Sequence, residues 1–191
     1  MKTEDILLKS EALLSGHFLY TSGRHGAQYM QCARVLQYPE YTEALAKTVA
    51  AGFEGEKIDI VLAPAVGGIV WGYELARALG AKSIFAERED GKMTLRRGFE
   101  IPKGTRIVVA EDVITTGGTV LEVLEIAKTH GAEIIGVGVI VDRSGGKIDL
   151  GTKIAAALTT EIASYAPEDC PLCKQGLPIT KPGSRATVTS V

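Results

Sequence analysis

The stretch Arg106-Ile107-Val108-Val109-Ala110-Glu111-Asp112-Val113-Ile114-Thr115-Thr116-Gly117-Gly118-Thr119 decides the fold of this chain. An apolar run ends in two acidic residues, a short loop of threonine and glycine follows, and a helical pattern then begins. This order predicts a buried strand, a loop and a helix. It places two carboxylates and a row of backbone N–H groups at one edge of a sheet.

Two kinds of binding group meet in this segment. The carboxylates of Glu111 and Asp112 can accept hydrogen bonds from vicinal hydroxyls. The N–H groups of residues 115–119, together with the threonine hydroxyls and the start of the helix dipole, can hold a phosphate. A ligand that is both a sugar diol and a phosphate ester satisfies both halves, so the segment predicts a site for a ribose 5-phosphate.

Composition sets the broad class of protein. The chain has 191 residues, of which 46% are hydrophobic, and a formal net charge of −2. This length is sufficient for one domain with a sizeable core, and the balance of charge excludes a disordered chain or a basic nucleic-acid surface. The acidic N-terminus has no signal-peptide core, and no apolar run reaches membrane-spanning length. We therefore expect a cytoplasmic protein that binds neither nucleic acid nor membranes.

Apolar segments and helical patterns alternate from about residue 41 onward. A helix is expected over 41–53, a second follows Gly67-Gly68 and ends at Leu79-Gly80, and a third opens at Thr119 with capping-box spacing to Glu122. The expected strands cover residues 58–63, 83–86, 106–110, 134–141 and 153–158. Strands that are apolar on both faces indicate a mostly parallel five-stranded sheet with helices on both faces, an α/β fold.

The first 40 residues have a different pattern. An apolar stripe from Ile6 to Leu14 predicts one helix, which Ser15-Gly16 ends. Residues 17–25 have the composition of a turn between two short strands.

Three strand ends are expected to converge on one crevice, because ligands of such sheets bind beyond the carboxyl ends of the strands. These ends carry Pro64–Gly68, Glu111–Thr119 and Asp142-Arg143. The glycines of the first loop allow close approach to an anion, although a plain turn is the alternative. Arg143 could form paired hydrogen bonds with a carboxylate or a pyrimidine carbonyl. Its alternative role is an ion pair with Asp142 or Asp149.

Residues 87–104 form a long polar segment with glycines at 91 and 98. Such segments are often lids, and Arg88 and Lys92 could close over an anionic ligand. The alternative is a solvated charged hairpin, in which Arg96 and Arg97 are surface charges.

The cysteines do not indicate a disulfide framework, because there are only three and no signal segment is expected. Cys170-Pro-Leu-Cys173 has the spacing of half a zinc site, and a tetrahedral site needs two further ligands. The three histidines, His17, His25 and His130, are distant in sequence. A tight structural turn is therefore the preferred interpretation.

The segment 106–119 resembles the phosphoribosyl-diphosphate (PRPP) signature of type I phosphoribosyltransferases. Within that family the chain is similar to orotate phosphoribosyltransferases, both in Phe18–Arg24 with Tyr29 and in the tail from Cys170 to Arg185. It departs from better-known members at Thr21 and Gly67, where they carry lysine, and in a shorter lid without histidine. The resemblance implies one domain, with a core over about 41–159 and a hood built from 1–40 and about 160–191.

The resemblance also implies a reaction and a set of roles. Orotate and PRPP would give orotidine 5′-monophosphate and pyrophosphate, a step of pyrimidine and UMP biosynthesis, in a homodimer whose lid reaches across the interface. Catalysis is expected from Glu111, Asp112 and Lys92, and orotate binding from Thr115 and Arg143. PRPP is expected to contact Glu111, Asp112, Val113, Ile114, Thr115, Thr116, Gly117, Gly118, Thr119, Arg88 and Lys92. No metal ligands are assigned in the protein, because Mg²⁺ would be held mainly by PRPP.

Two alternatives stay open. The chain could transfer phosphoribosyl groups to another nucleobase, or it could be a non-catalytic regulator that senses PRPP. Regulators usually need a nucleic-acid surface or an added DNA-binding domain, which the near-neutral chain does not offer.

Overall fold

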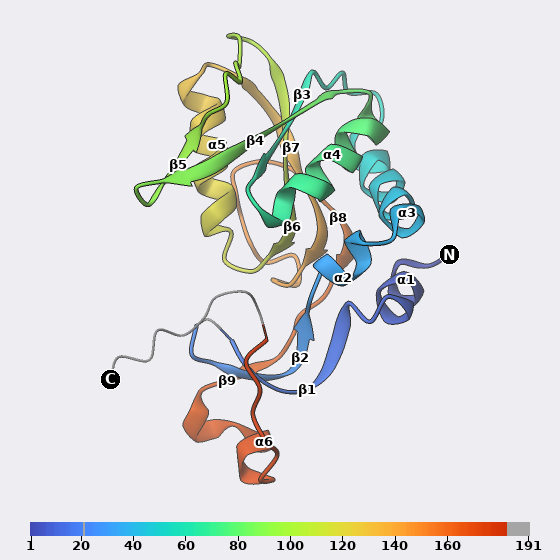
Figure 1. Cartoon of the computed structure of the whole chain (residues 1–191), viewed down its shortest axis with the longest axis vertical. Coiled ribbons are helices and arrows are strands. Elements are labelled where there is room, and N and C mark those ends of the chain that lie inside the picture. The colour runs from blue at the N-terminus through green and yellow to red at the C-terminus, as the bar shows by residue number, and fades with distance from the viewer. Residues whose placement is uncertain (21, 183–191) are drawn as a thin grey trace.

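The structure is a computed structural model that describes residues 1–20 and 22–182. Its centre is a six-stranded sheet in the order β5-β4-β3-β6-β7-β8 (Figure 1). The strands are β3 (Ile60–Pro64), β4 (Lys82–Glu89), β5 (Lys92–Leu95), β6 (Arg106–Ile114), β7 (Glu133–Asp142) and β8 (Ile154–Thr159). All neighbours are parallel except β5, which pairs antiparallel with β4. The five expected strands are therefore confirmed, and the sheet gains an edge strand where a loop was expected.

Helices cover both faces of this sheet (Figure 1). Helices α3 (Pro39–Ala50) and α4 (Gly67–Leu79) pack on one face, and α5 (Gly118–Thr129) packs on the other. Alternation along β3 explains the two cores, because Val61 and Ala63 face α4 whereas Ile60 and Leu62 face α5. None of the described helices is long and apolar enough to cross a membrane.

Helix α4 lies unusually close to the sheet. A Cβ on Gly72 would come within 2.7 Å of the Ala63 side chain, so only glycine allows this approach. The indole N–H of Trp71 donates a hydrogen bond to the Gly138 carbonyl on β7 at 3.0 Å. The close packing fixes the start of α4 relative to the strand ends.

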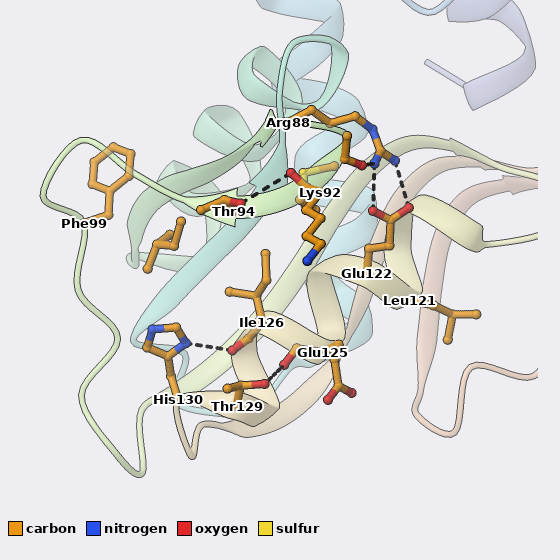
Figure 2. Close-up of a pocket in the computed structure, with 13 residues that line it drawn as sticks. Arg88, Lys92, Thr94, Phe99, Leu121, Glu122, Glu125, Ile126, Thr129 and His130 are labelled. Atoms are coloured by element: carbon orange, nitrogen blue, oxygen red, sulfur yellow. Dashed lines mark hydrogen bonds and ion pairs between the residues drawn. The ribbon is translucent and has the colours of Figure 1, made fainter.

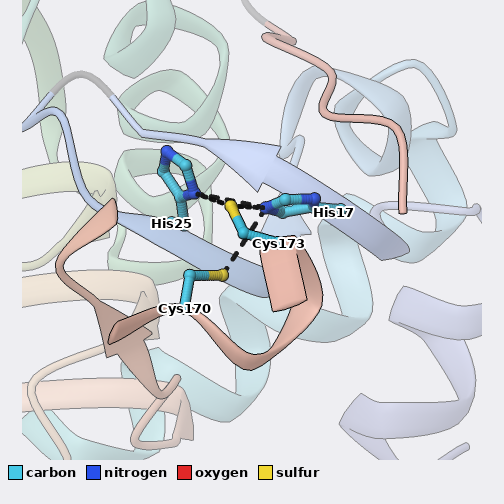
Figure 3. Close-up of side chains that lie close together, drawn as sticks. All are labelled: His17, His25, Cys170 and Cys173. Carbon is cyan, nitrogen blue, oxygen red and sulfur yellow. Dashed lines mark hydrogen bonds between the residues drawn. The ribbon is translucent and has the colours of Figure 1, made fainter. Parts of the chain in front are cut away.

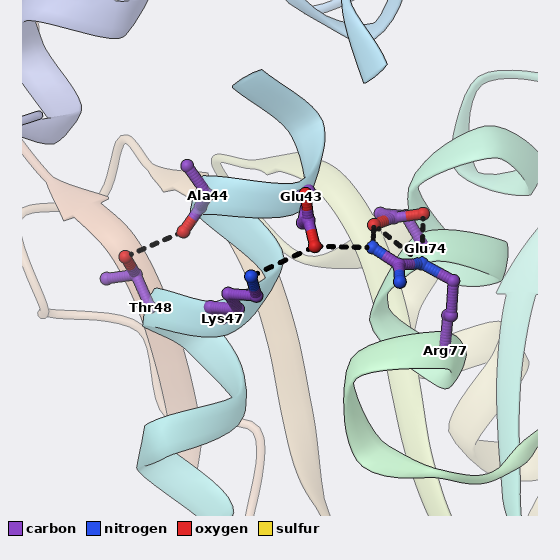
Figure 4. A network of polar contacts seen from close by, with 6 residues as sticks. All are labelled: Glu43, Ala44, Lys47, Thr48, Glu74 and Arg77. Carbon is purple, nitrogen blue, oxygen red and sulfur yellow. Dashed lines mark hydrogen bonds and ion pairs between the residues drawn. The ribbon is translucent and has the colours of Figure 1, made fainter. Parts of the chain in front are cut away.

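A polar network joins α3 and α4 on the surface (Figure 4). Arg77 contacts Glu74 at 2.6 Å and Glu43 at 3.1 Å, and Lys47 contacts Glu43 at 2.9 Å. Arg77, Lys47 and Glu43 are exposed and Glu74 is half-buried, so each pair contributes roughly 0–1 kcal/mol. The apolar core, rather than this network, holds the two helices together.

A second, three-stranded sheet forms the hood at one end of the core (Figure 1). It consists of β1 (Leu13–Leu19), β2 (His25–Met30) and β9 (Ser164–Tyr165) in the order β1-β2-β9. A 3₁₀ turn (Pro167–Asp169) and the short helix α6 (Pro171–Lys174) follow β9. The chain then returns to β1, where the N–H of Thr180 bonds the His17 carbonyl at 2.8 Å.

The N-terminal helix is shorter than the sequence predicts. Helix α1 spans Thr3–Lys9, and Leu13 and Leu14 belong to β1, where they pair with Met30 and Tyr29. Glu11 has a positive φ of 52°, which ends the helical path. The continuous apolar stripe was misleading because a helix end and a strand start both bury leucines. Two further short helical segments, α2 (Ala33–Leu36) and the 3₁₀ turn Ala51–Phe53, flank α3.

Candidate active site

The loop between β6 and α5 forms a cradle of backbone N–H groups. Gly117 precedes α5 with a φ of 74°, and a Cβ there would lie 2.6 Å from Ile148 and 2.8 Å from Leu150. Glycine is therefore required at this position. No side chain of the described residues caps the helix, so its first N–H groups are free to bind an anion.

The predicted capping box is wrong. The helix begins at Gly118 rather than after Thr119, and the Glu122 carboxylate binds Arg88 instead of turning back to the helix start. The loop borders a cavity of about 360 Å³. Its lining comprises Glu111, residues 113–120, Arg88 and Glu122. The structure thus brings together the PRPP residues expected on this loop and Arg88.

The two acids lie at the carboxyl end of β6. Glu111 is buried, with 9% of its surface exposed. Its Oε1 accepts a hydrogen bond from the Asp112 N–H at 3.1 Å, and Asp112 Oδ1 accepts one from the Val113 N–H at 2.9 Å. Burial, with the neighbouring Asp112 carboxylate, raises the pKa of Glu111 to about 8, and burial also raises the pKa of Asp112. Ionising both carboxylates is therefore costly in the folded protein without a ligand.

The β3–α4 loop approaches this acid pair. A Cβ on Gly67 would lie 3.7 Å from Asp112 Oδ2, which is ordinary contact distance. The Ala65–Val66 peptide bond is cis, and the Val66 side chain is exposed. Because β3 also pairs with β6, the ends of these two strands meet, as expected from the sequence.

Arg143 follows β7 and belongs to the third strand end that was expected at this crevice. Its backbone N–H bonds the Ile114 carbonyl at 2.9 Å, and its guanidinium lies 4.9 Å from the centre of the Tyr20 ring. Its Nε is buried and has no hydrogen-bond partner among residues 1–20 and 22–182. A buried guanidinium N–H without a partner is costly unless a ligand supplies one.

The ion-pair alternative for Arg143 is wrong. Asp142 accepts hydrogen bonds from the Ser144 N–H and hydroxyl at 2.8 and 2.6 Å and thereby closes its own turn. Asp149 accepts one from the Gly151 N–H at 2.8 Å. Within the part of the chain that the structure describes, no carboxylate forms a salt bridge with Arg143.

A second cavity, of about 660 Å³, lies between the hood and the core. Hood residues and residues from the strand ends share its lining: Tyr20, Ser22, Arg24, Tyr29, Met30, Asp112, Val113, Thr115, Thr116, Arg143, Ile162 and Ser164. Val113, Thr115 and Thr116 also line the cavity of about 360 Å³ at the β6–α5 loop (the phosphate cavity), so the two cavities adjoin. One ligand can therefore reach from the helix N-terminus to Arg143.

The segment expected as a lid is a β-hairpin. Asp90 and Gly91, both with positive φ, form the two-residue turn between β4 and β5. Arg88 forms a two-bond ion pair with Glu122 on α5, at 2.8 and 2.9 Å (Figure 2). Lys92 lines another cavity, of about 890 Å³, between the hairpin and α5. This cavity shares Arg88 and Glu122 with the phosphate cavity, which Lys92 itself does not line. The hairpin geometry matches the alternative given for this segment, whereas its mobility stays a prediction.

Some lining residues had no signal in the sequence. Met30 lies at the end of β2, Ser164 on β9 and Ile162 just before β9, and β2 pairs with β9 in the hood beside the second cavity. Ser164 also accepts a hydrogen bond from Arg24 Nε at 2.9 Å, which holds the turn of the hood. Two features quoted from the sequence, Thr21 and Gly183–Arg185, lie outside the described residues.

The fold and the site are those of a phosphoribosyltransferase. Residues 34–154 match the model of the phosphoribosyl transferase domain. The chain is similar to the orotate phosphoribosyltransferase of Pelotomaculum thermopropionicum, with 58% identity over 94% of this chain and 95% of the relative. It is 57% identical to that of Chlorobium phaeobacteroides, over 95% and 94% of the two chains.

A solved structure supports the same assignment. The crystal structure of orotate phosphoribosyltransferase from Aeropyrum pernix superposes with a TM-score of 0.67 at 27% identity, covering 81% of this chain and 92% of that one. The chain belongs to the orotate phosphoribosyltransferase family of type I phosphoribosyltransferases.

Proposed function

We propose that this chain transfers the 5-phosphoribosyl group from PRPP to orotate, giving orotidine 5′-monophosphate and pyrophosphate in pyrimidine nucleotide biosynthesis. The observation that carries the choice of base is Arg143, whose buried Nε has no hydrogen-bond partner in the described part of the chain and whose side chain lines a cavity that adjoins the phosphate loop. A planar carboxylate is the natural partner of a guanidinium. The names of the relatives point to the same base.

In this proposal the two halves of the 106–119 segment would hold the ribose 5-phosphate part of PRPP. The N–H groups of the loop and of the α5 start would bind the 5′-phosphate. Glu111 and Asp112 would accept hydrogen bonds from the ribose hydroxyls. Because Asp112 also lines the second cavity, the anomeric carbon would point towards that cavity, where Thr115 and Arg143 would hold orotate.

The chemistry is displacement at the anomeric carbon through a cationic, oxocarbenium-like transition state. The acid pair lies where positive charge develops on the ribose and would stabilise it. The remaining tasks are to orient two substrates and to exclude water. Orotate already carries an acidic ring nitrogen, so no strong general base is required.

Mg²⁺ is part of this proposal, held mainly by PRPP. The strand end offers two neighbouring carboxylates, and in the described residues no third acidic or histidine ligand joins them. Such a sparse donor set fits a cation that keeps several waters and uses substrate oxygens. When bound, Mg²⁺ would neutralise charge on the departing pyrophosphate.

A role for Arg88 and Lys92 on the pyrophosphate requires a further step. Arg88 is paired with Glu122, and Lys92 does not line the phosphate cavity of its own chain. Either the hairpin rearranges, or the hairpin of a second copy reaches the site. We favour the second route and propose a homodimer.

An exposed apolar surface supports the homodimer. Val66, Val70 and Tyr73 are exposed by 82%, 52% and 66%, and they share one side of the α4 start beside the β3–α4 loop. An exposed patch of this kind next to an active site is typical of an interface. The cytoplasmic location expected from the sequence stays a prediction.

The rival within the same fold is transfer to another base. The test is a panel of orotate, uracil and adenine, each with PRPP and Mg²⁺, scored by release of pyrophosphate. We expect turnover with orotate and little with the other two. Preference for adenine would exclude the orotate assignment while leaving phosphoribosyl transfer intact, and no release with any base would favour the PRPP sensor.

A further inference from the structure

Four potential metal ligands from three parts of the chain meet in the hood (Figure 3). His17 is on β1, His25 is on β2, and Cys170 and Cys173 flank the start of α6. Their ligand atoms all lie within 4.8 Å of one another. The sequence offered only the cysteine pair, because pairing of β1 with β2 is what brings the two histidines beside it.

Four of the six separations between these atoms are close to the edges of a tetrahedron, and the other two are no more than 4.8 Å. A zinc ion about 2.3 Å from sulfur and about 2.05 Å from nitrogen sets its ligands about 3.6 Å apart for S···N and about 3.3 Å apart for N···N. In the structure, His17 Nε2 lies 3.2 Å from His25 Nδ1. The S···N distances are 3.6 Å from Cys170 to His17, 3.7 Å from Cys173 to His17 and 3.2 Å from Cys173 to His25.

Hydrogen bonding alone does not satisfy this cluster. His17 Nδ1 lies 2.8 Å from the Leu177 carbonyl, which can only accept, so Nδ1 carries the proton. Neutral His17 then has one lone pair, on Nε2, facing His25 Nδ1 and both sulfur atoms. One lone pair cannot serve three neighbours, whereas a cation at their centre binds all four groups.

Burial and orientation also fit a metal site. His17 and His25 are 5% and 8% exposed, and Cys170 is fully buried. Buried polar groups of this kind need partners. The contact from His17 to the Leu177 carbonyl is the arrangement that commonly fixes the ring of a metal-bound histidine.

We propose that His17, His25, Cys170 and Cys173 bind one structural zinc ion. A tetrahedral set of two sulfur and two nitrogen ligands selects zinc, and four protein ligands leave no open position for catalysis. Before binding, Cys170 and Cys173 are thiols; they lose their protons to solvent and bind as thiolates.

The ion would fasten the C-terminal segment to the β1–β2 hairpin. The turn of that hairpin carries Tyr20 and Arg24, which line the cavity beside Arg143. Zinc therefore acts at a distance from the reacting atoms, by holding the hood in place over the base. Its loss is expected to weaken orotate binding more than PRPP binding.

The test uses the full chain, purified without a metal-affinity tag and without chelator. Elemental analysis should find one zinc per chain. Substituting cobalt should give the intense visible absorption of tetrahedral Co²⁺ together with a near-ultraviolet thiolate-to-cobalt band. Cys173→Ser, at an exposed position that leaves no cavity, should lose most of the zinc and the thiolate band. The matched control Cys32→Ser, a buried cysteine outside the cluster, should keep both.

Other results would overturn the proposal. Reduced wild-type protein that takes up no zinc, or whose cobalt form has the pale spectrum of an octahedral ion, contradicts it. So does a disulfide between Cys170 and Cys173 in the protein as isolated, or an equal zinc content in Cys173→Ser. Removing zinc from the wild type with a chelator and restoring it separates metal binding from any folding defect of the variants.

Discussion

The guanidinium of Arg143 lies 4.9 Å from the centre of the Tyr20 ring, and this contact joins the end of β7 to the hood. This cation–π contact leaves the Arg143 Nε buried and without a hydrogen-bond partner within the described residues. The cavity of about 660 Å³ is thus lined by residues of both sheets, and Arg143 and Tyr20 contact each other across it.

Arg143→Ala should weaken orotate binding by roughly 2–4 kcal/mol, because a buried anionic ligand loses its charge-assisted partner. Calorimetric titration with orotate measures this loss. Arg143→Lys, the matched control, keeps the charge but not the planar fork and should recover only part of the affinity. Weakening of PRPP binding to the same extent would show that Arg143 does not read the base.

Asp112→Asn should lower kcat by roughly 10²–10³, because a charge facing the cationic transition state is lost. The side chain keeps its size, so the melting temperature should change little. Steady-state kinetics with saturating orotate and PRPP provide the measurement. Turnover within a few-fold of the wild type would remove Asp112 from the mechanism.

Glu111 should make the stability of the ligand-free protein depend on pH. The pKa of Glu111 is about 8 in the folded state against a usual 4.5, so the folded chain holds a proton that the unfolded chain releases. The favourable contribution is complete below pH 4.5 and is lost as the pH rises through about 8. Glu111→Gln should therefore match the wild type near pH 5 and melt at a higher temperature near pH 9, as scanning calorimetry would show.

Glu122→Gln is the control of opposite sign. The Arg88 guanidinium lowers the pKa of Glu122, so its contribution is present above pH 4.5 and is lost on acidification. This variant should not gain stability near pH 9. A gain in both variants would mean that general charge, rather than burial of Glu111, sets the trend.

The Arg88–Glu122 pair should restrain the β4–β5 hairpin. Glu122→Gln removes one charge of an exposed pair, so global stability should fall by no more than about 1 kcal/mol. Amide exchange over residues 87–95 should nevertheless become faster, because the hairpin loses its contact with α5. Glu125→Gln, one turn further along the same helix, is the control. Equal exchange in both variants would assign the restraint to strand pairing alone.

Mixing inactive Lys92→Ala chains with inactive Asp112→Asn chains tests the shared lid. If the hairpin of one chain serves the site of its neighbour, one hybrid site carries both native residues and activity should return. The measurement is pyrophosphate release after exchange of subunits. Proven exchange without recovered activity would show that each hairpin serves its own chain.

The local order of the sequence predicted the parallel core well. The 106–119 segment combines a buried strand, an acid pair and a glycine-rich loop. Each of these features can be read from neighbouring residues, and each is present in the structure. Contacts between distant segments could not be predicted. The partner of Arg88 is Glu122, 34 residues away, and the same glutamate had the spacing of a capping residue.

The hood is where sequence reasoning was weakest. Leucines 13 and 14 continue an apolar stripe that suits either a helix or a strand, and the choice rests on pairing with β2. The cysteine pair was visible, but its neighbours His17 and His25 depend on strands that meet only in three dimensions. Potential metal ligands that are spread over three short elements leave no periodic pattern in the sequence.

Trp71 is the only tryptophan of the 191-residue chain, and it is fully buried between α4 and β7. The molecule thus carries a single indole fluorophore, which lies in the core on the α4 face of the central sheet. Its emission reports the solvent exposure of the α4 face of the central sheet and has no competing signal from another indole. Exposure of this part of the core can therefore be followed by selective excitation of one indole in the native sequence.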